Sequence, residues 1–124
     1  MSLAHLVPGN VVLWVWMKDQ QGRNPKFRPV VILAVNAART QAIACAVTHT
    51  RPAKIPPEYV PLSWNSRGTT STRLYQPSWA VASWLARGLG NADIRIEKIG
   101  RLSSKEMNAL LAKVKQHAAN SGVI

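Results

Sequence analysis

Acidic residues are scarce in this chain. Five Asp and Glu face sixteen Lys and Arg, which gives a formal net charge of +11 over 124 residues. So few carboxylates argue against a catalytic metal held by them, and the three histidines His5, His49 and His117 stand far apart in the sequence. We therefore expect no metal and no cofactor. The excess of positive charge indicates a polyanionic partner, either a nucleic acid (RNA or DNA) or an acidic protein; an anionic membrane surface is the weakest choice.

Cysteine and long apolar runs are also missing. Cys45 is the sole cysteine and lies within an apolar stretch, which excludes a disulfide scaffold and a cysteine-ligated metal site. We favour a buried small hydrophobe at Cys45 over a nucleophile. The N-terminus lacks the basic start and apolar stretch of a signal peptide, and no run is long enough to span a membrane. These absences predict a cytoplasmic protein without membrane contact. P-loop, dinucleotide and zincin motifs are absent as well.

Apolar residues make up 47% of the chain, enough for one folded domain over residues 1–124. The central stretch 26–35, KFRPVVILAV, is aliphatic and β-branched, which favours a buried strand over a helix. Pro29 is expected at the first residue of that strand, where a missing N–H costs least. Arg28 would then stand at the mouth of the core with its guanidinium pointing outward. The alternative is that Arg28 only flanks the strand as a solvated charge.

The segment before this stretch predicts a strand over residues 11–17, after a Pro-Gly turn at 8–10. Its alternation places Trp14 and Trp16 on one face, where we favour packing over a stacking platform for bases. The polar stretch 18–26 predicts a mobile loop. Its charge makes it a candidate clamp for a nucleic-acid backbone, although an ordinary solvated hairpin tip is the alternative.

Residues 36–39 predict a turn and residues 40–47 a third strand, which ends at the polar sequence THTRP, 48–52. Hydroxyl groups, a histidine and an arginine at a strand end form a second candidate cluster. Threonine hydroxyls at such positions more often bond the local backbone. A single histidine is more often a surface or capping residue than a general base. Both interpretations stay open on local sequence alone.

The second half of the chain predicts further strands and one helix. Residues 58–64 suit an edge strand because Pro61 cannot donate to a central ladder, and 65–72 suit a polar turn. The following segment predicts a strand pair, or a strand plus a short turn, with 80–85 as its core strand; 94–99 predicts a short last strand ending at Gly100. Ser103 and Glu106 have capping-box spacing. They open a helix of about 103–119, whose apolar positions recur at helical spacing: Met107, Leu110, Leu111, Val114 and Ala118.

The order of these pieces resembles the MazF/PemK-like toxins of type II toxin–antitoxin systems. The resemblance runs from PGNVVLWVW through FRPVVILAV and AIACAVTHT to IEKIGRLSSKEMNALLAKVK. It implies a mostly β, SH3-like small barrel with a C-terminal α-helix, commonly a homodimer. It further implies a metal-independent endoribonuclease that acts on single-stranded RNA, inhibits growth and is neutralised by an acidic cognate antitoxin.

The resemblance also implies roles for particular residues. The catalytic Arg of the family falls on Arg28 and its catalytic Thr on Thr48. A fixed guanidinium can stabilise the charge of a phosphorane, and a hydroxyl can position the scissile phosphate. We add His49 as a candidate general base, because imidazole has a better-matched pKa than arginine. Candidate RNA contacts lie around these positions: Arg23, Lys26, Phe27, Thr50 and Arg51. Phe27 stands where the family usually carries a second basic residue.

Two other functions compete with this interpretation. A non-catalytic nucleic-acid-binding module would use Trp14, Trp16 and the 18–26 loop for stacking and phosphate contact. A structural interaction domain would bind an acidic protein and leave RNA untouched. Only the toxin requires Arg28 and Thr48 for more than affinity.

Overall fold

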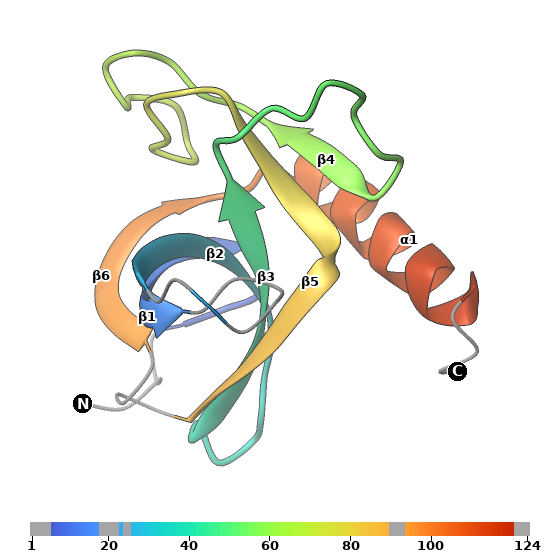
Figure 1. Cartoon of the computed structure of the whole chain (residues 1–124). Coiled ribbons are helices and arrows are strands. Elements are labelled where there is room, and N and C mark those ends of the chain that lie inside the picture. The colour runs from blue at the N-terminus through green and yellow to red at the C-terminus, as the bar shows by residue number, and fades with distance from the viewer. Residues whose placement is uncertain (1–5, 18–22, 24–25, 90–93, 121–124) are drawn as a thin grey trace.

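The computed structural model describes residues 6–17, 23, 26–89 and 94–120. Within them the chain is mostly β, as predicted, and closes with one helix (Figure 1). The elements in chain order are β1 (Asn10–Met17), β2 (Lys26–Val35), β3 (Gln41–Thr48), β4 (Tyr59–Leu62), β5 (Ser78–Leu89), β6 (Ile94–Arg101) and α1 (Ser104–Asn120).

The six strands form one antiparallel sheet in the order β4-β5-β3-β2-β1-β6. The sheet curls into a small open barrel of the SH3-like type, and α1 lies beside β4 and β5 on its outside (Figure 1). β4 stands at one edge of the sheet and contains Pro61, which confirms the prediction of an edge strand.

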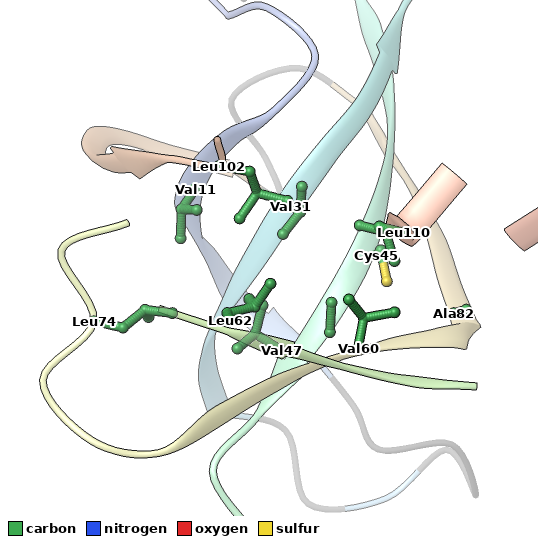
Figure 2. Packing of buried hydrophobic residues seen from close by; sticks show 11 residues of the cluster. Val11, Val31, Cys45, Val47, Val60, Leu62, Leu74, Ala82, Leu102 and Leu110 are labelled. Carbon is green, nitrogen blue, oxygen red and sulfur yellow. The ribbon is translucent and has the colours of Figure 1, made fainter. Parts of the chain in front are cut away.

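Strand alternation divides the apolar side chains between two clusters. The first, which we call the Trp14 cluster, consists of Leu6, Val12, Trp14, Val30, Ile32, Ala42, Ala44 and Ala46. The second, the helix-side cluster, joins the opposite faces of β1, β2 and β3 to β4, β5 and α1; it includes Val11, Val31, Cys45, Val47, Leu62 and Leu110 (Figure 2). This division explains why the β2 run is purely aliphatic: its successive residues pack alternately into the two clusters, one on each face of the sheet.

Trp14 is only 6% exposed and belongs to its cluster. The prediction that this tryptophan packs in the core is therefore confirmed. The side chain of Trp16 lies outside the described part of the structure.

The position of Pro29 corrects the sequence prediction. β2 begins at Lys26, so Pro29 is the fourth residue of the strand and not the first. Lys26 likewise belongs to β2 and not to the preceding loop. The register between β2 and β3 begins at Val30, opposite Ala46. Pro29 thus lies one residue beyond the paired part of that ladder, while on the other side it pairs with Leu13 of β1.

The predicted segments 11–17, 40–47, 58–64 and 103–119 differ from β1, β3, β4 and α1 by one or two residues at their ends, and the last two strands differ more. β5 is one strand of twelve residues that contains the predicted core strand 80–85 and follows a bend, so the strand-plus-turn alternative holds. β6 continues past Gly100 to Arg101. Most of the predicted 18–26 loop lies outside the described residues.

The helix start confirms the capping box. The backbone N–H of Glu106 donates to Ser103 Oγ at 3.1 Å, and the N–H of Ser103 donates to Glu106 Oε1 at 3.0 Å. The second carboxylate oxygen of Glu106 accepts the N–H of Ser63 at 2.7 Å. Leu110 then buries its side chain in the helix-side cluster. The capping box therefore also ties α1 to the segment after β4.

Candidate active site

Arg28 lies near the start of β2, between two neighbouring strands. On one side it pairs in register with Trp14 of β1. On the other side, the β2–β3 register pairs Val30 with Ala46. Arg28 lies two residues before Val30 and Thr48 two residues after Ala46, both beyond the paired part of this ladder. Because every second residue of a strand points to the same face, Arg28 and Thr48 fall on the face of Val30 and Ala46, which is that of the Trp14 cluster.

The guanidinium of Arg28 is held against an aromatic ring. Its central carbon lies 5.1 Å from the centre of the Trp84 ring, within cation–π distance. Arg28 is half-buried; that its guanidinium points out of the core stays a prediction. Trp84 comes from the middle of β5 and packs against the Trp14 cluster, so this ring links the cation to the core.

Thr48 is the last residue of β3. Its Oγ1 accepts a hydrogen bond from the backbone N–H of Thr50 at 3.2 Å. This bond is the local one that threonine hydroxyls commonly make after a strand. It orients the Thr48 side chain, and the hydroxyl hydrogen remains as a donor for another acceptor.

His49 follows the end of β3, next to the pair that Thr48 forms with Trp79 of β5. Its Nδ1 lies 2.8 Å from the hydroxyl of Ser78. Ser78 in turn donates its hydroxyl hydrogen to the backbone carbonyl of Gln76 at 2.8 Å. The ring of Tyr75 lies beside the imidazole, with 6.4 Å between ring centres and 34° between ring planes. His49 is therefore oriented by the segment that leads into β5.

The remaining sequence candidates are spread around these groups. Arg23, Phe27, Thr50 and Arg51 are exposed, with Phe27 at 40%. Exposed cations and an exposed ring suit contact with a charged, base-bearing polymer. The side chain of Lys26 is outside the described part of the structure. Cys45 is fully buried and its thiol donates to the carbonyl of Val81 at 3.0 Å. Burial raises the pKa of Cys45 to about 12, which confirms the small hydrophobe and argues against a nucleophile.

Three contributors were missed from the sequence: Trp84, Ser78 and Tyr75. Each lies more than 25 positions after Arg28 or Thr48, on or just before β5. Sequence offered only a weak signal for Trp84, an aromatic residue within an apolar run. It offered none for Ser78, because only the pairing of β3 with β5 places it beside His49.

Metal-ligand clusters and membrane-spanning helices were both sought in the described residues. Within the described ranges, no three His, Cys, Asp or Glu side chains are grouped as metal ligands would be. None of the helical structure described is long and apolar enough to cross a bilayer.

Comparison with known proteins places the chain in a family. Two solved structures share its fold. One is an endoribonuclease from a mycobacterial species, which is 15% identical in sequence. The match covers 92% of this chain and 91% of that chain, with a TM-score of 0.65. The other is MazF from Deinococcus radiodurans, with 18% identity, coverage of 93% and 98%, and a TM-score of 0.66. A search of curated proteins found no match. A family model for PemK-like, MazF-like toxins matches residues 9–118. The chain therefore belongs to the PemK-like, MazF-like toxins of type II toxin–antitoxin systems.

Proposed function

We propose that this protein is the toxin of a type II toxin–antitoxin system and an endoribonuclease that cleaves single-stranded RNA without a metal ion. Family membership and the endoribonuclease title of a structural neighbour support the reaction class. The observation that carries the proposal to particular residues is the placement of Arg28. It combines a permanent cation, an aromatic support at 5.1 Å from its central carbon and, by strand alternation, a position on the same face of the sheet as Thr48.

The proposed reaction is attack by a ribose 2′-oxygen on the adjacent phosphorus. The 2′-oxygen–phosphorus bond forms as the phosphorus–5′-oxygen bond breaks, leaving a 2′,3′-cyclic phosphate and a 5′-hydroxyl. Negative charge accumulates on the phosphoryl oxygens in the transition state. The Arg28 guanidinium stabilises that charge, and because Trp84 already restricts it, little reorganisation is needed during the reaction. Thr48 donates its hydroxyl hydrogen to a non-bridging oxygen and holds the phosphate for in-line attack.

His49 is the proposed acceptor of the 2′ proton. Arginine remains protonated in proteins and is a poor base, whereas imidazole exchanges protons near neutral pH. The 5′-oxygen takes its proton from solvent. The hydrogen bond to Ser78 and the neighbouring Tyr75 ring hold the imidazole at the end of β3, next in sequence to Thr48.

The remaining contacts follow from charge. Arg23, Lys26, Phe27, Thr50 and Arg51 are the proposed contacts to the RNA backbone and bases. The net charge of +11 also suits an acidic antitoxin, whose carboxylates would compete with RNA for the same cations. A cytoplasmic location, where messenger RNA is accessible, belongs to this proposal. The homodimer implied by the family resemblance stays a prediction.

The test is incubation of the purified protein with a long single-stranded RNA in EDTA, followed by analysis of the fragment ends. We expect discrete cuts with 2′,3′-cyclic phosphate ends. Arg28→Ala should lower the rate by at least about 100-fold, as loss of a charge-stabilising donor does. Arg87→Ala is the matched control: it removes an equal charge from an exposed position on β5 and should cleave like the wild type.

Three outcomes would overturn the proposal in different ways. RNA that is bound but left intact would indicate the non-catalytic nucleic-acid-binding module. Cleavage by Arg28→Ala at the wild-type rate would remove Arg28 from the site while leaving the enzyme class standing. Absence of RNA binding at low salt would favour the domain that binds only an acidic protein.

A further inference from the structure

The hydroxyl of Ser78 lies between two partners whose chemistry differs. On one side is the backbone carbonyl of Gln76, 2.8 Å away, and on the other is Nδ1 of His49, also 2.8 Å away. A carbonyl oxygen can only accept a hydrogen bond, and a serine hydroxyl has one hydrogen to donate. When that hydrogen is donated to Gln76, the hydroxyl can only accept from the imidazole.

The consequence for His49 is a defined tautomer. Nδ1 must carry a hydrogen in order to donate to Ser78, whether the ring is neutral or protonated. In the neutral ring the lone pair therefore resides on Nε2. A base needs such a lone pair, so the bond to Ser78 determines which nitrogen of His49 can accept a proton.

The surroundings of Ser78 make this arrangement rigid. Ser78 is only 2% exposed and is the first residue of β5. The neighbouring residue Trp79 pairs with Thr48 at the end of β3. A buried hydroxyl must satisfy its hydrogen-bonding capacity within the protein. Water therefore competes poorly for Ser78, and the two bonds hold the imidazole at a defined angle.

We propose that Ser78 is a positioning residue: by donating to the Gln76 carbonyl it holds His49 as the Nδ1–H tautomer and presents Nε2 as the base that receives the 2′ proton of RNA. This inference rests on the proposed endoribonuclease function. It assigns Ser78 no contact with RNA. Its effect is exerted through His49, in the way that a second hydrogen-bonding group orients a catalytic histidine.

The titratable and charged groups around His49 enter its pH dependence as well. Tyr75 lies against the ring and Arg51 follows two residues later in the chain. Arg28 lies on β2, the strand next to β3. Both cations are unchanged in the variants below. A difference between those variants therefore reports on Ser78.

The first measurement is nitrogen NMR of the full-length protein labelled with ¹⁵N-histidine. The chain has three histidines, and His49→Ala identifies the signals of His49 by their loss. At a pH where His49 is neutral, we expect the wild type to show a protonated Nδ1 and an unprotonated Nε2. Ser78→Ala should shift the signals toward a mixture of tautomers. Ser83→Ala, a half-buried serine on the same strand, should leave them unchanged.

The second measurement is the pH–rate profile for RNA cleavage by the same proteins. General-base catalysis is worth about 10²–10⁴-fold, so His49→Ala should lose about that much. Ser78→Ala should lose less, roughly 10- to 100-fold in kcat with little change in KM, and its ascending limb should move in pH. Ser83→Ala should match the wild type in both.

The two measurements separate failure of this inference from failure of the proposed function. A wild-type protein with a protonated Nε2, or a Ser78→Ala protein with unchanged tautomer and unchanged pH profile, overturns the role of Ser78 even if RNA is cut. If the wild type cuts no RNA, the proposed function fails, whereas NMR still decides the tautomer. Loss of dispersed signals in Ser78→Ala would indicate that this variant is unfolded. In that case Ser78→Thr, which keeps the hydroxyl, must restore both the fold and the Nδ1–H tautomer of His49. A folded Ser78→Thr protein without that tautomer also overturns the proposal.

Discussion

The guanidinium of Arg28 lies 5.1 Å from the centre of the Trp84 ring. The two residues are 56 positions apart in sequence and reach each other because β3 pairs with β2 on one side and β5 on the other. A stacked guanidinium loses rotational freedom before any phosphate arrives. Trp84 thereby orients the cation that the proposed reaction depends on.

Replacing Trp84 should weaken cleavage through Arg28. A cation–π contact is worth about 0.5–2 kcal/mol, so Trp84→Leu should lower the cleavage rate about 2- to 30-fold. Trp84→Phe keeps a ring face and should lie closer to the wild type. The measurement is single-turnover cleavage with saturating protein, accompanied by thermal unfolding to exclude a folding defect. Equal rates for the leucine and phenylalanine variants would contradict a role for the ring face.

The hydroxyl of Thr48 can be tested separately from its shape. Thr48→Val keeps the volume and deletes the donor, and should reduce cleavage by about 10- to 1,000-fold if one hydrogen bond to the transition state is lost. Thr48→Ser keeps the donor and should retain most of the rate. Cleavage assays on both variants decide the matter. A valine variant as active as the wild type would remove Thr48 from the site.

Gly100 should resist substitution for a steric reason. A Cβ at this position would overlap the backbone carbonyl of Thr72, which cannot move as a side-chain end could. Overpacking typically costs about 1–3 kcal/mol. Gly100→Ala should therefore lower the free energy of unfolding by at least about 1 kcal/mol. Gly68, with a φ of +66° and more room, provides the comparison: Gly68→Ala should cost about 1 kcal/mol from backbone strain alone. Urea unfolding measures both, and an alanine at position 100 without cost would contradict the packing described.

Glu106 should make stability depend on pH in the acidic range. Burial raises the pKa of its carboxyl, but the hydrogen bonds from Ser103 and Ser63 together outweigh burial, and the pKa is lowered overall. The folded state therefore favours the ionised form. The resulting stability is present above the ordinary carboxyl pKa of about 4.3 and is lost as pH falls through the lower folded-state pKa.

Comparison with Glu106→Gln isolates this effect. The variant keeps an acceptor oxygen for the capping box but loses the negative charge at the helix N-terminus, so it should be less stable than the wild type by about 0.3–1 kcal/mol near neutral pH. The difference should shrink as pH falls below about 4. Urea unfolding over that pH range measures it. A difference that stays constant with pH would show that the charge of Glu106 is not involved.

Cys45 should be unreactive in the folded protein. Its thiol is buried and its pKa is raised to about 12, so little thiolate forms at neutral pH. Alkylating reagents should modify Cys45 only after denaturation, and Cys45→Ala should cleave RNA at the wild-type rate. Rapid labelling of the native protein would contradict the burial described here.

Local patterns were sufficient for several elements of this fold. The alternation of 11–17, the aliphatic run of 26–35 and the capping box at Ser103 each predicted an element that the structure contains. They succeeded because strand alternation, β-branched packing and helix capping depend on neighbours within a few residues. Charge likewise required only a count of residues: an excess of sixteen basic over five acidic side chains predicts a polyanionic partner in any fold.

The surroundings of the candidate site depended on tertiary structure. Sequence indicated Arg28, Thr48 and His49, but it did not indicate that Trp84 supports the first or that Ser78 binds the last. Those contacts arise from the pairing of β3 with β5 and from an irregularity in its register between Cys45 and Val47. Such an irregularity changes which residues of β5 face the end of β3. Long-range register is a property of the whole sheet, and it alone decided which side chains complete the site.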